Sequence, residues 1–196
     1  QHLPNKLANQ HGITLQQAKD NMAREYEKVV GTLNWYCLDY WADKLDIDIV
    51  EAKREINHLI SMRADSLPFI DALKASGREV ILVTNAHPDS LSLKVEHTQL
   101  DHHIDQLIST HEFAVTKESQ LLWQKLHAKL GFAPQHTLFV DDSLGILKAA
   151  QDFGIKHLLA VSNPDSQQPN REISEFPAIQ DYRYLLDDIM TNPVVG

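Results

Sequence analysis

Two adjacent carboxylates, Asp141 and Asp142, follow a short apolar run that extends from Thr137 to Val140. Like charges this close repel, and each raises the free-energy cost of ionising the other. A bound cation offsets that repulsion. Paired carboxylates suit Mg²⁺, because this hard cation prefers oxygen ligands. The pair therefore predicts a magnesium site at the end of a buried strand.

Two further groups of polar residues follow apolar runs of the same kind. Thr84 and Asn85 end one run, and Lys117 lies beyond the run at 106–110 and just before a helical segment. A hydroxyl, an amide and an ammonium group suit the oxygens of a phosphate. Ligands of open parallel sheets bind beyond the carboxyl ends of the strands, so we expect these residues and the two aspartates at such ends.

The elements that must position these residues lie in the second part of the chain. Short β-branched runs at 80–84, 106–110, 137–141 and 157–161 alternate with helical segments near 89–99, 118–130 and 144–153. Strands buried on both faces and joined by helices predict a parallel sheet in a three-layer α/β arrangement. The longest expected loop covers 162–177.

The first part of the chain, from about Thr14 to Met62, has helical spacing with few glycines or prolines. Thr14 followed by Gln17 predicts a capping box at a helix start. One apolar stripe at helical spacing is expected to comprise Leu33, Tyr36, Cys37, Tyr40, Trp41 and Leu45. We therefore expect a helical domain over 1–62 and an α/β domain over 63–196.

Composition excludes several classes of function. The net charge of −9 over 196 residues disfavours nucleic-acid polymers and anionic membranes as partners, although one local phosphate pocket remains compatible with it. No apolar run approaches the ~20 residues that span a bilayer, and the N-terminus has no signal-peptide profile. Because Cys37 is the single cysteine, a disulfide framework and a multi-cysteine zinc site are excluded, and we expect a cytoplasmic location. The eleven histidines are expected at the surface.

The strand-end motifs resemble a known family. The segments 81–85 and 138–142, together with Lys117, are similar to motifs II, III and IV of the haloacid dehalogenase (HAD) superfamily, in that order. Within it, the strings at 32–41, 84–88 and 162–166 resemble the bacterial GMP/IMP-type purine 5'-nucleotidases. This resemblance covers nearly the whole chain. It implies a Rossmann-like core with a small helical cap inserted before the motif II strand.

The resemblance also implies an activity. A member of this group would be a Mg²⁺-dependent phosphomonoester hydrolase that acts on GMP or IMP through an aspartyl-phosphate intermediate. Thr84 and Asn85 would bind the phosphoryl oxygens, and Lys117 would stabilise the nucleophile and the phosphate. Asp141 and Asp142 would hold or orient Mg²⁺, with Asp142 the expected direct ligand. The family often has proline beside the lysine, where this chain has threonine and glutamate.

The nucleophile of the family has no match in the sequence. Motif I, an Asp-x-Asp string at the end of a strand, supplies a nucleophile and a general acid. The one string of that form, Asp46-Ile-Asp48, follows a helical segment, so we reject it. We expect the motif I strand to lie upstream of the 196 residues. Without that strand the 196 residues would be inactive. Its absence would leave a gap between the strands that end at Thr84 and Asp141.

Substrate discrimination is expected to come from the helical cap. Asn34 and Trp35 lie off the apolar stripe and are the best candidates to contact a base, whereas the stripe itself is better explained by core packing. Arg63, near the return from cap to core, is equally compatible with a surface charge and with a phosphate or base contact.

Alternatives stay open for each motif and for the function. The two aspartates could cap a helix, Thr84 and Asn85 could form an ordinary turn, and Lys117 could be a solvated lysine. The rival enzyme is a HAD phosphatase or mutase for a sugar phosphate. The rival of another class is a non-catalytic binding protein that has lost motif I. The sequence leaves the oligomeric state open.

Overall fold

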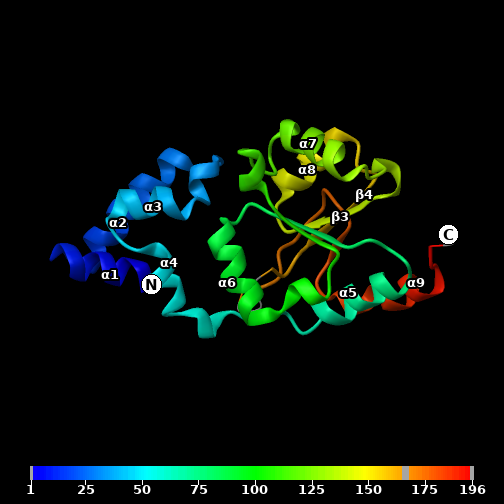
Figure 1. The fold of residues 1–196 in the computed structure, drawn as a ribbon, viewed down its shortest axis with the longest axis horizontal. Coiled ribbons are helices and arrows are strands. Elements are labelled where there is room, and N and C mark those ends of the chain that lie inside the picture. The colour runs from blue at the N-terminus through cyan, green and yellow to red at the C-terminus, as the bar shows by residue number, and fades with distance from the viewer. Residues whose placement is uncertain (1, 165–167, 195–196) are drawn as a thin grey trace. The chain divides into compact units, whose positions relative to one another are not determined.

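The computed structural model describes residues 2–164 and 168–194, which form helices and short parallel strands (Figure 1). The α-helices are α1 (His2–His11), α2 (Leu15–Val29), α3 (Leu38–Leu45), α4 (Ile49–Arg54), α5 (Ser66–Ala75), α6 (Pro88–Thr98), α7 (Gln120–Leu130), α8 (Leu144–Phe153) and α9 (Leu186–Thr191). The strands are β1 (Ile81–Thr84), β2 (Gln106–Ser109), β3 (Leu138–Asp141), β4 (His157–Val161) and β5 (Ala178–Ile179). Short 3-10 helices are η1 (Leu33–Trp35), η2 (Asn57–Leu59), η3 (Leu100–His102), η4 (Thr110–Phe113), η5 (Pro134–His136) and η6 (Tyr182–Leu185).

The chain divides into two compact units. The first comprises residues 1–61, 83–100 and 109–116, and the second comprises 62–82, 101–108 and 117–196. Within the described ranges, no helix combines the length and the apolar character that a membrane span requires.

The helices α1 to α4 of the first unit pack around an apolar core. The predicted capping box is confirmed, because the Thr14 hydroxyl accepts from the Gln17 backbone N–H while the Gln17 side chain accepts from the Thr14 N–H. The core contains Leu7, Ala8, Ala18, Met22, Val29, Leu38, Trp41, Leu45, Ile47, Ile49 and Ala52. Burying each large apolar side chain stabilises the fold by roughly 1.5 to 3 kcal/mol.

The predicted single stripe at 33–45 is wrong in one respect. The chain forms η1 and then α3, with Cys37 in an extended conformation (φ −81°, ψ 116°) as the residue before α3. The indole N–H of Trp41 donates to the carbonyl of Trp35 at 3.0 Å, which holds the two helical segments together. Only Trp41 and Leu45 of the stripe are fully buried. The break removes Cys37 from a helical face, which sequence periodicity cannot show.

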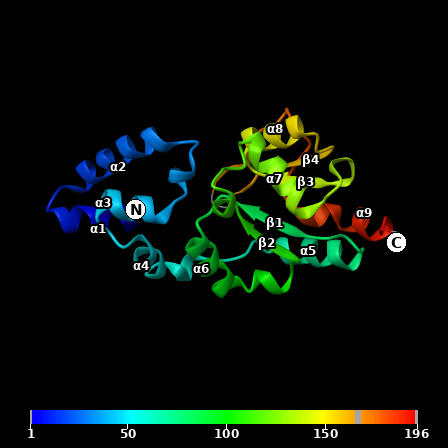
Figure 2. The same cartoon turned by 45° about the horizontal axis from the view of Figure 1, so that its top comes forward.

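The second unit contains a parallel sheet with helices on both sides, and this confirms the predicted α/β class. Strands β3, β4 and β5 lie in that order, with Asp141 opposite Ala160 and Val161 opposite Ile179. Figures 1 and 2 show α7 and α8 on one side of β3 and β4, and α5 and α9 on the other side. The two-residue strand β5 lies directly after the expected loop and is too short to give an alternating pattern.

The strands form two hydrogen-bonded sheets instead of one. Strand β1 pairs with β2, and in the described part of the chain β3 pairs with β4 alone. Figure 2 shows β1 and β2 as neighbouring arrows. The gap expected between the strands that end at Thr84 and Asp141 stays a prediction.

Candidate active site

The carboxylate of Asp141 ends strand β3 and forms a buried ion pair. Its Oδ2 atom accepts from Nζ of Lys117 at 2.5 Å, and the two side chains are only 5% and 14% exposed. Its Oδ1 atom accepts from the backbone N–H of Ser143 at 2.9 Å. Both oxygens of Asp141 are therefore engaged, and Lys117 is not a solvated lysine.

The position of Lys117 depends on the helix that follows it. Its carbonyl accepts from the indole N–H of Trp123 on α7 at 3.0 Å. The Trp123 ring packs edge-on against Phe139 of β3, with centroids 4.9 Å apart. Aromatic packing of this kind contributes about 0.5 to 1.5 kcal/mol beyond burial. The loop before α7 is thus fixed to the strand that carries Asp141.

Asp142 is the first residue after β3 and lies in a different environment from its neighbour. Its side chain is 56% exposed. The guanidinium of Arg171 donates to the carbonyls of Asp142 at 2.8 Å and Val161 at 3.1 Å, and lies 3.7 Å from the Asp142 carboxylate. Arg171 falls in the expected loop, and no spacing signal singled it out.

The alternative that the two aspartates cap a helix is wrong. Ser143 caps α8, since its hydroxyl accepts from the backbone N–H of Ile146 at 3.4 Å. The carboxylates instead offer a site with one buried and one exposed acid. Mg²⁺ is commonly held by one or two carboxylates, several waters and substrate phosphates. The exposed oxygens of Asp142 beside the Lys117–Asp141 pair fit that chemistry.

Thr84 and Asn85, in the first unit, form an ordered turn after β1. The Thr84 hydroxyl accepts from the backbone N–H of Ala86 at 3.1 Å, so its own hydrogen remains a donor. The Asn85 side chain is buried, and its Oδ1 atom accepts from the hydroxyl of Thr110 at 3.0 Å. Its carbonyl accepts from Nε2 of His111 at 3.2 Å. These contacts make Asn85 a positioning residue for the turn, and its contact with a phosphoryl group stays a prediction.

Asn34 and Trp35 are both exposed. The Trp35 ring packs against Tyr26, with centroids 5.1 Å apart and planes 57° apart, and is 36% exposed. An aromatic ring that is held on one side and open on the other can stack on a flat ligand. Trp41 belongs to the core, and contact of Trp35 or Asn34 with a base stays a prediction.

Comparisons with known proteins decide the family. The family model of the haloacid dehalogenase-like hydrolases matches residues 6–154 of this chain. The chain belongs to this family. It is 45% identical over 188 residues to the GMP/IMP nucleotidase YrfG of Escherichia coli (strain K12), and the match covers 96% of this chain and 85% of that protein. It is also 29% identical over 91 residues to an (S)-2-haloacid dehalogenase of Pseudomonas fluorescens, which covers 46% of this chain and 40% of that protein.

A solved structure supports the same fold. The HAD phosphatase from Thermococcus onnurineus superposes with a TM-score of 0.80 over 98% of this chain and 88% of that one, at 20% identity. The predicted Rossmann-like HAD fold is therefore confirmed. The protein is a HAD-type hydrolase, so the interpretation as a non-catalytic binding protein is not supported.

The rejected Asp-x-Asp string of this HAD hydrolase lies in a turn. Asp46 follows α3 in a left-handed conformation (φ 52°), and Asp48 caps α4 by accepting from the backbone N–H of Glu51 at 2.8 Å. Neither carboxylate ends a strand. The sequence-based rejection of this string as motif I agrees with that geometry.

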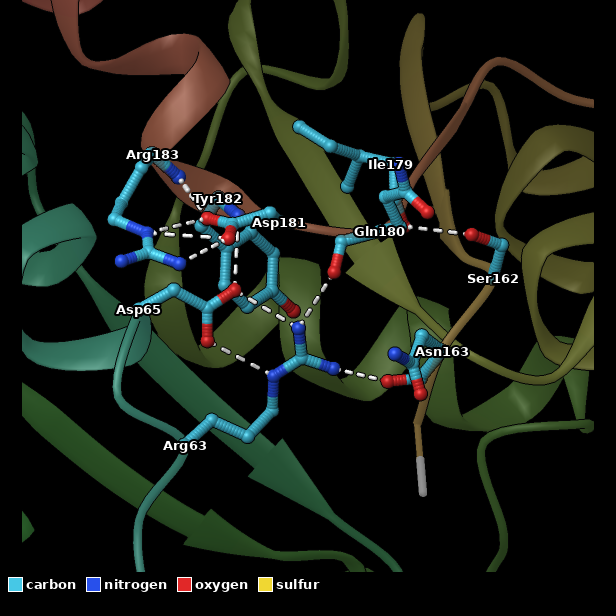
Figure 3. A network of polar contacts seen from close by, with 9 residues as sticks. All are labelled: Arg63, Asp65, Ser162, Asn163, Ile179, Gln180, Asp181, Tyr182 and Arg183. Atoms are coloured by element: carbon cyan, nitrogen blue, oxygen red, sulfur yellow. Dashed lines mark hydrogen bonds and ion pairs between the residues drawn. The ribbon is translucent and has the colours of Figure 1, made fainter. Parts of the chain in front are cut away.

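Arg63 of the HAD hydrolase is not a solvated surface charge, and its contact with a phosphate or a base stays a prediction. Figure 3 shows its guanidinium between Asp65 and the chain segments at 162–163 and 179–183. Its Nε and one NH2 group bind the two Asp65 oxygens at 3.0 and 2.8 Å, and other N–H groups donate to the carbonyls of Asn163 and Gln180. Arg63 therefore connects three segments of the second unit. The rest of the string at 162–166, from Asp165 to Ser166, lies outside the described residues.

The acid partner of Arg63 is almost fully buried. The guanidinium holds the pKa of Asp65 below its usual value, and the backbone N–H of Tyr182, which donates at 2.9 Å, lowers that pKa further. The Tyr182 ring stacks on Phe69 with centroids 4.6 Å apart. Sequence reasoning missed Asp65 because only the tertiary structure brings Tyr182 beside it.

Two histidines contradict the expectation of surface positions. The His87 side chain is only 12% exposed, and its ring lies edge-on to that of His111, with centroids 5.0 Å apart. Burial lowers the pKa of the His111 imidazole, and the nearby His87 lowers it further. Both rings lie in the first unit beside the turn that carries Thr84 and Asn85.

Proposed function

We propose that this protein hydrolyses purine 5'-nucleotides, GMP or IMP, as a Mg²⁺-dependent phosphomonoesterase. The observation that carries the proposal is the 45% identity, over 96% of the chain, to an enzyme named GMP/IMP nucleotidase. The match to a haloacid dehalogenase is weaker and covers only 46% of the chain, so dehalogenation is the less supported activity. The partner is then a small phosphorylated nucleotide and not a nucleic-acid polymer or a membrane. The proposed location of the protein is the cytoplasm.

The arrangement of residues supports phosphoryl transfer by electrostatic stabilisation. Bound Mg²⁺ would supply positive charge to phosphoryl oxygens, with Asp142 as its direct ligand and Asp141 orienting the site. Lys117, fixed by its bond to Asp141, adds a second positive charge at the end of β3. The Thr84 hydroxyl supplies a donor for a phosphoryl oxygen. Positioning and charge stabilisation account for most of the catalysis in phosphoryl transfer.

The nucleophile in this proposal is an aspartate on a strand outside the 196 residues. Its carboxylate oxygen attacks phosphorus, the nucleoside leaves with the ester oxygen and a proton, and water then hydrolyses the aspartyl-phosphate. Two observations support this: no Asp-x-Asp string ends a strand in the described ranges, and β3 pairs on one side only there. An added strand would satisfy the unpaired backbone groups of β3.

An assay on the protein with its motif I strand tests the proposal. Phosphate release should be faster from GMP and IMP than from hexose phosphates, and excess chelator should abolish it. A preference for hexose phosphates would favour the sugar-phosphate phosphatase or mutase instead. Full activity in chelator would contradict the role of Mg²⁺, and no hydrolysis of any phosphate ester would contradict catalysis itself.

A further inference from the structure

A cluster of sulfur and nitrogen ligands lies in the first unit, apart from the residues assigned to Mg²⁺. One ligand atom each from Cys37, His87 and His111 lies within 4.8 Å of the other two. Cys37 is a free, partly buried thiol immediately before α3, His87 precedes α6, and His111 belongs to η4. We propose that these three residues bind a thiophilic divalent transition metal of the Zn²⁺ class.

The hydrogen bond of His111 leaves its other ring nitrogen, Nδ1, available to a metal. Its Nε2 atom lies 3.2 Å from the carbonyl of Asn85, and a carbonyl can only accept, so Nε2 carries the hydrogen. The lone pair of the neutral ring is then on Nδ1. Histidines that bind metals usually donate their other N–H to a carbonyl or a carboxylate, which fixes the ring. Asn85 provides that support here.

His87 has carboxylates near both ring nitrogens. Nδ1 lies 3.6 Å from a carboxylate oxygen of Asp89, and Nε2 lies 3.6 Å from one of Asp39. The Nδ1 atom also accepts from the backbone N–H of Asp89 at 3.4 Å, so in the neutral ring the hydrogen is on Nε2. Binding of a metal through Nε2 therefore requires the hydrogen to move to Nδ1, where the Asp89 carboxylate can accept it in place of that long bond. Asp39, His87 and Asp89 also lie within 4.8 Å of one another through one atom each. Asp39, which is exposed, therefore lies near His87, although it is not a member of the group that contains Cys37 and His111.

The ligand atoms of this cluster favour a different metal from the one that the aspartate pair favours. A thiolate and two imidazoles suit Zn²⁺ and its neighbours, whereas Mg²⁺ prefers oxygen. Zinc bonds of about 2.0 to 2.3 Å place tetrahedral ligand atoms roughly 3.3 to 3.8 Å apart. Because no separation in the cluster exceeds 4.8 Å, each has to shorten by about 1.5 Å at most, which side-chain rotation can supply. The Cys37 segment would then be tied to the segments that follow β1 and β2.

Titration of the tag-free, reduced protein with Co²⁺ tests the proposal in the presence of excess Mg²⁺. We expect one Co²⁺ per chain, a thiolate-to-cobalt charge-transfer band, and loss of the band on adding Zn²⁺. Cys37→Ser should lose the band, and Cys37→Ser, His87→Gln and His111→Gln should each weaken binding about tenfold or more. The matched control is His102→Gln, an exposed histidine of η3 whose loss should change nothing.

The variants distinguish loss of a ligand from loss of the fold. Serine is a favourable residue before a helix, so Cys37→Ser should keep the thermal stability of the metal-free protein. His111→Gln also removes a contact to Asn85 and could unfold the protein for that reason. In that event the test uses His87→Gln, provided that its circular dichroism spectrum is unchanged. Absence of the charge-transfer band in the wild type overturns the proposal. So does cobalt binding that survives both Cys37→Ser and His87→Gln, because other histidines would then be the ligands.

Discussion

Two buried ion pairs of the second unit have similar charges and different surroundings. Arg63 and Asp65 form a two-bond pair whose remaining N–H groups donate to backbone carbonyls of distant segments. Lys117 and Asp141 form a single bond at the end of β3, beside the exposed carboxylate of Asp142. The first pair is enclosed by the protein's own polar groups, whereas the second adjoins an exposed acid.

The difference separates a structural pair from a reactive one. The planar guanidinium of Arg63 matches a carboxylate and two carbonyls at once, and this rigid geometry suits a permanent junction. The ammonium of Lys117 is a compact point charge with three donors, which can be shared between Asp141 and a phosphoryl group. We therefore expect variants of the first pair to change stability alone, and variants of the second pair to change turnover as well as stability.

The largest effect should follow Asp142→Asn in a protein that carries motif I. Halving the negative charge beside the metal weakens its binding, and loss of one electrostatic stabiliser typically costs ~10²-fold or more in kcat. Steady-state kinetics across a Mg²⁺ titration measure the change. Asp152→Asn, an exposed acid of α8, is the matched control. Activity unchanged by Asp142→Asn would remove the proposed role of this carboxylate.

Lys117→Ala should come next, and Thr84→Ala should act in the same direction. Each removes a donor that matters more in the transition state than in the ground state, so kcat should fall by roughly 10²-fold while KM changes less. Lys117→Ala should also destabilise the fold, because the buried Asp141 loses its cation. A change confined to KM would mean that these residues only hold the substrate.

Arg63→Ala tests the structural pair. Breaking a buried ion pair costs about 3 to 5 kcal/mol, and since the Arg63 side chain is 31% exposed we expect roughly 2 to 3 kcal/mol from urea unfolding. The control is Arg183→Ala. Arg183 pairs with Asp181, two positions away in the sequence as Arg63 is from Asp65, but the Arg183 side chain is exposed. Equal losses for both variants would contradict the distinction drawn between them.

Discrimination between substrates is expected to depend on Asn34 and Trp35 of the first unit. Trp35→Ala should lower kcat/KM for GMP by roughly tenfold, since ~1.4 kcal/mol is a factor of ten and stacking on a base is worth ~1 to 3 kcal/mol. Asn34→Ala should act in the same direction. Trp35→Phe, which retains a ring, is the matched control. Equal losses on p-nitrophenyl phosphate would show that Trp35 only packs against Tyr26.

The smallest effect concerns pH. Asp65 has a folded pKa below its ordinary value of 3.8, so its contribution to stability is complete above that value and is lost as pH falls through the folded pKa. The difference in unfolding free energy between wild type and Arg63→Ala should therefore narrow under acidic conditions. Urea unfolding at several pH values measures it. A difference that stays constant down to acid pH would mean that packing against Tyr182, and not charge, gives Arg63 its effect.

The sequence predicted the elements and the strand-end residues, because both depend on local patterns. Alternation of apolar runs with helical segments located β1 to β4 and α6 to α8, and the order of Thr84, Lys117 and Asp141 matched the HAD motifs. It could not predict the break between η1 and α3. Helical spacing continues through that break, and the bond from Trp41 to Trp35 that stabilises it depends on how the chain folds back.

What the sequence determined by itself is therefore the family, the class of fold and the chemical types at the strand ends. Only the tertiary structure decided which carboxylate is buried, because the burial of Asp141 depends on Lys117, 24 residues earlier in the chain. The Arg63 junction joins residues separated by 100 and 117 positions, and the Cys37, His87 and His111 cluster joins three segments. Side chains so distant in sequence share no periodicity, and only the packing of the whole chain brings them together.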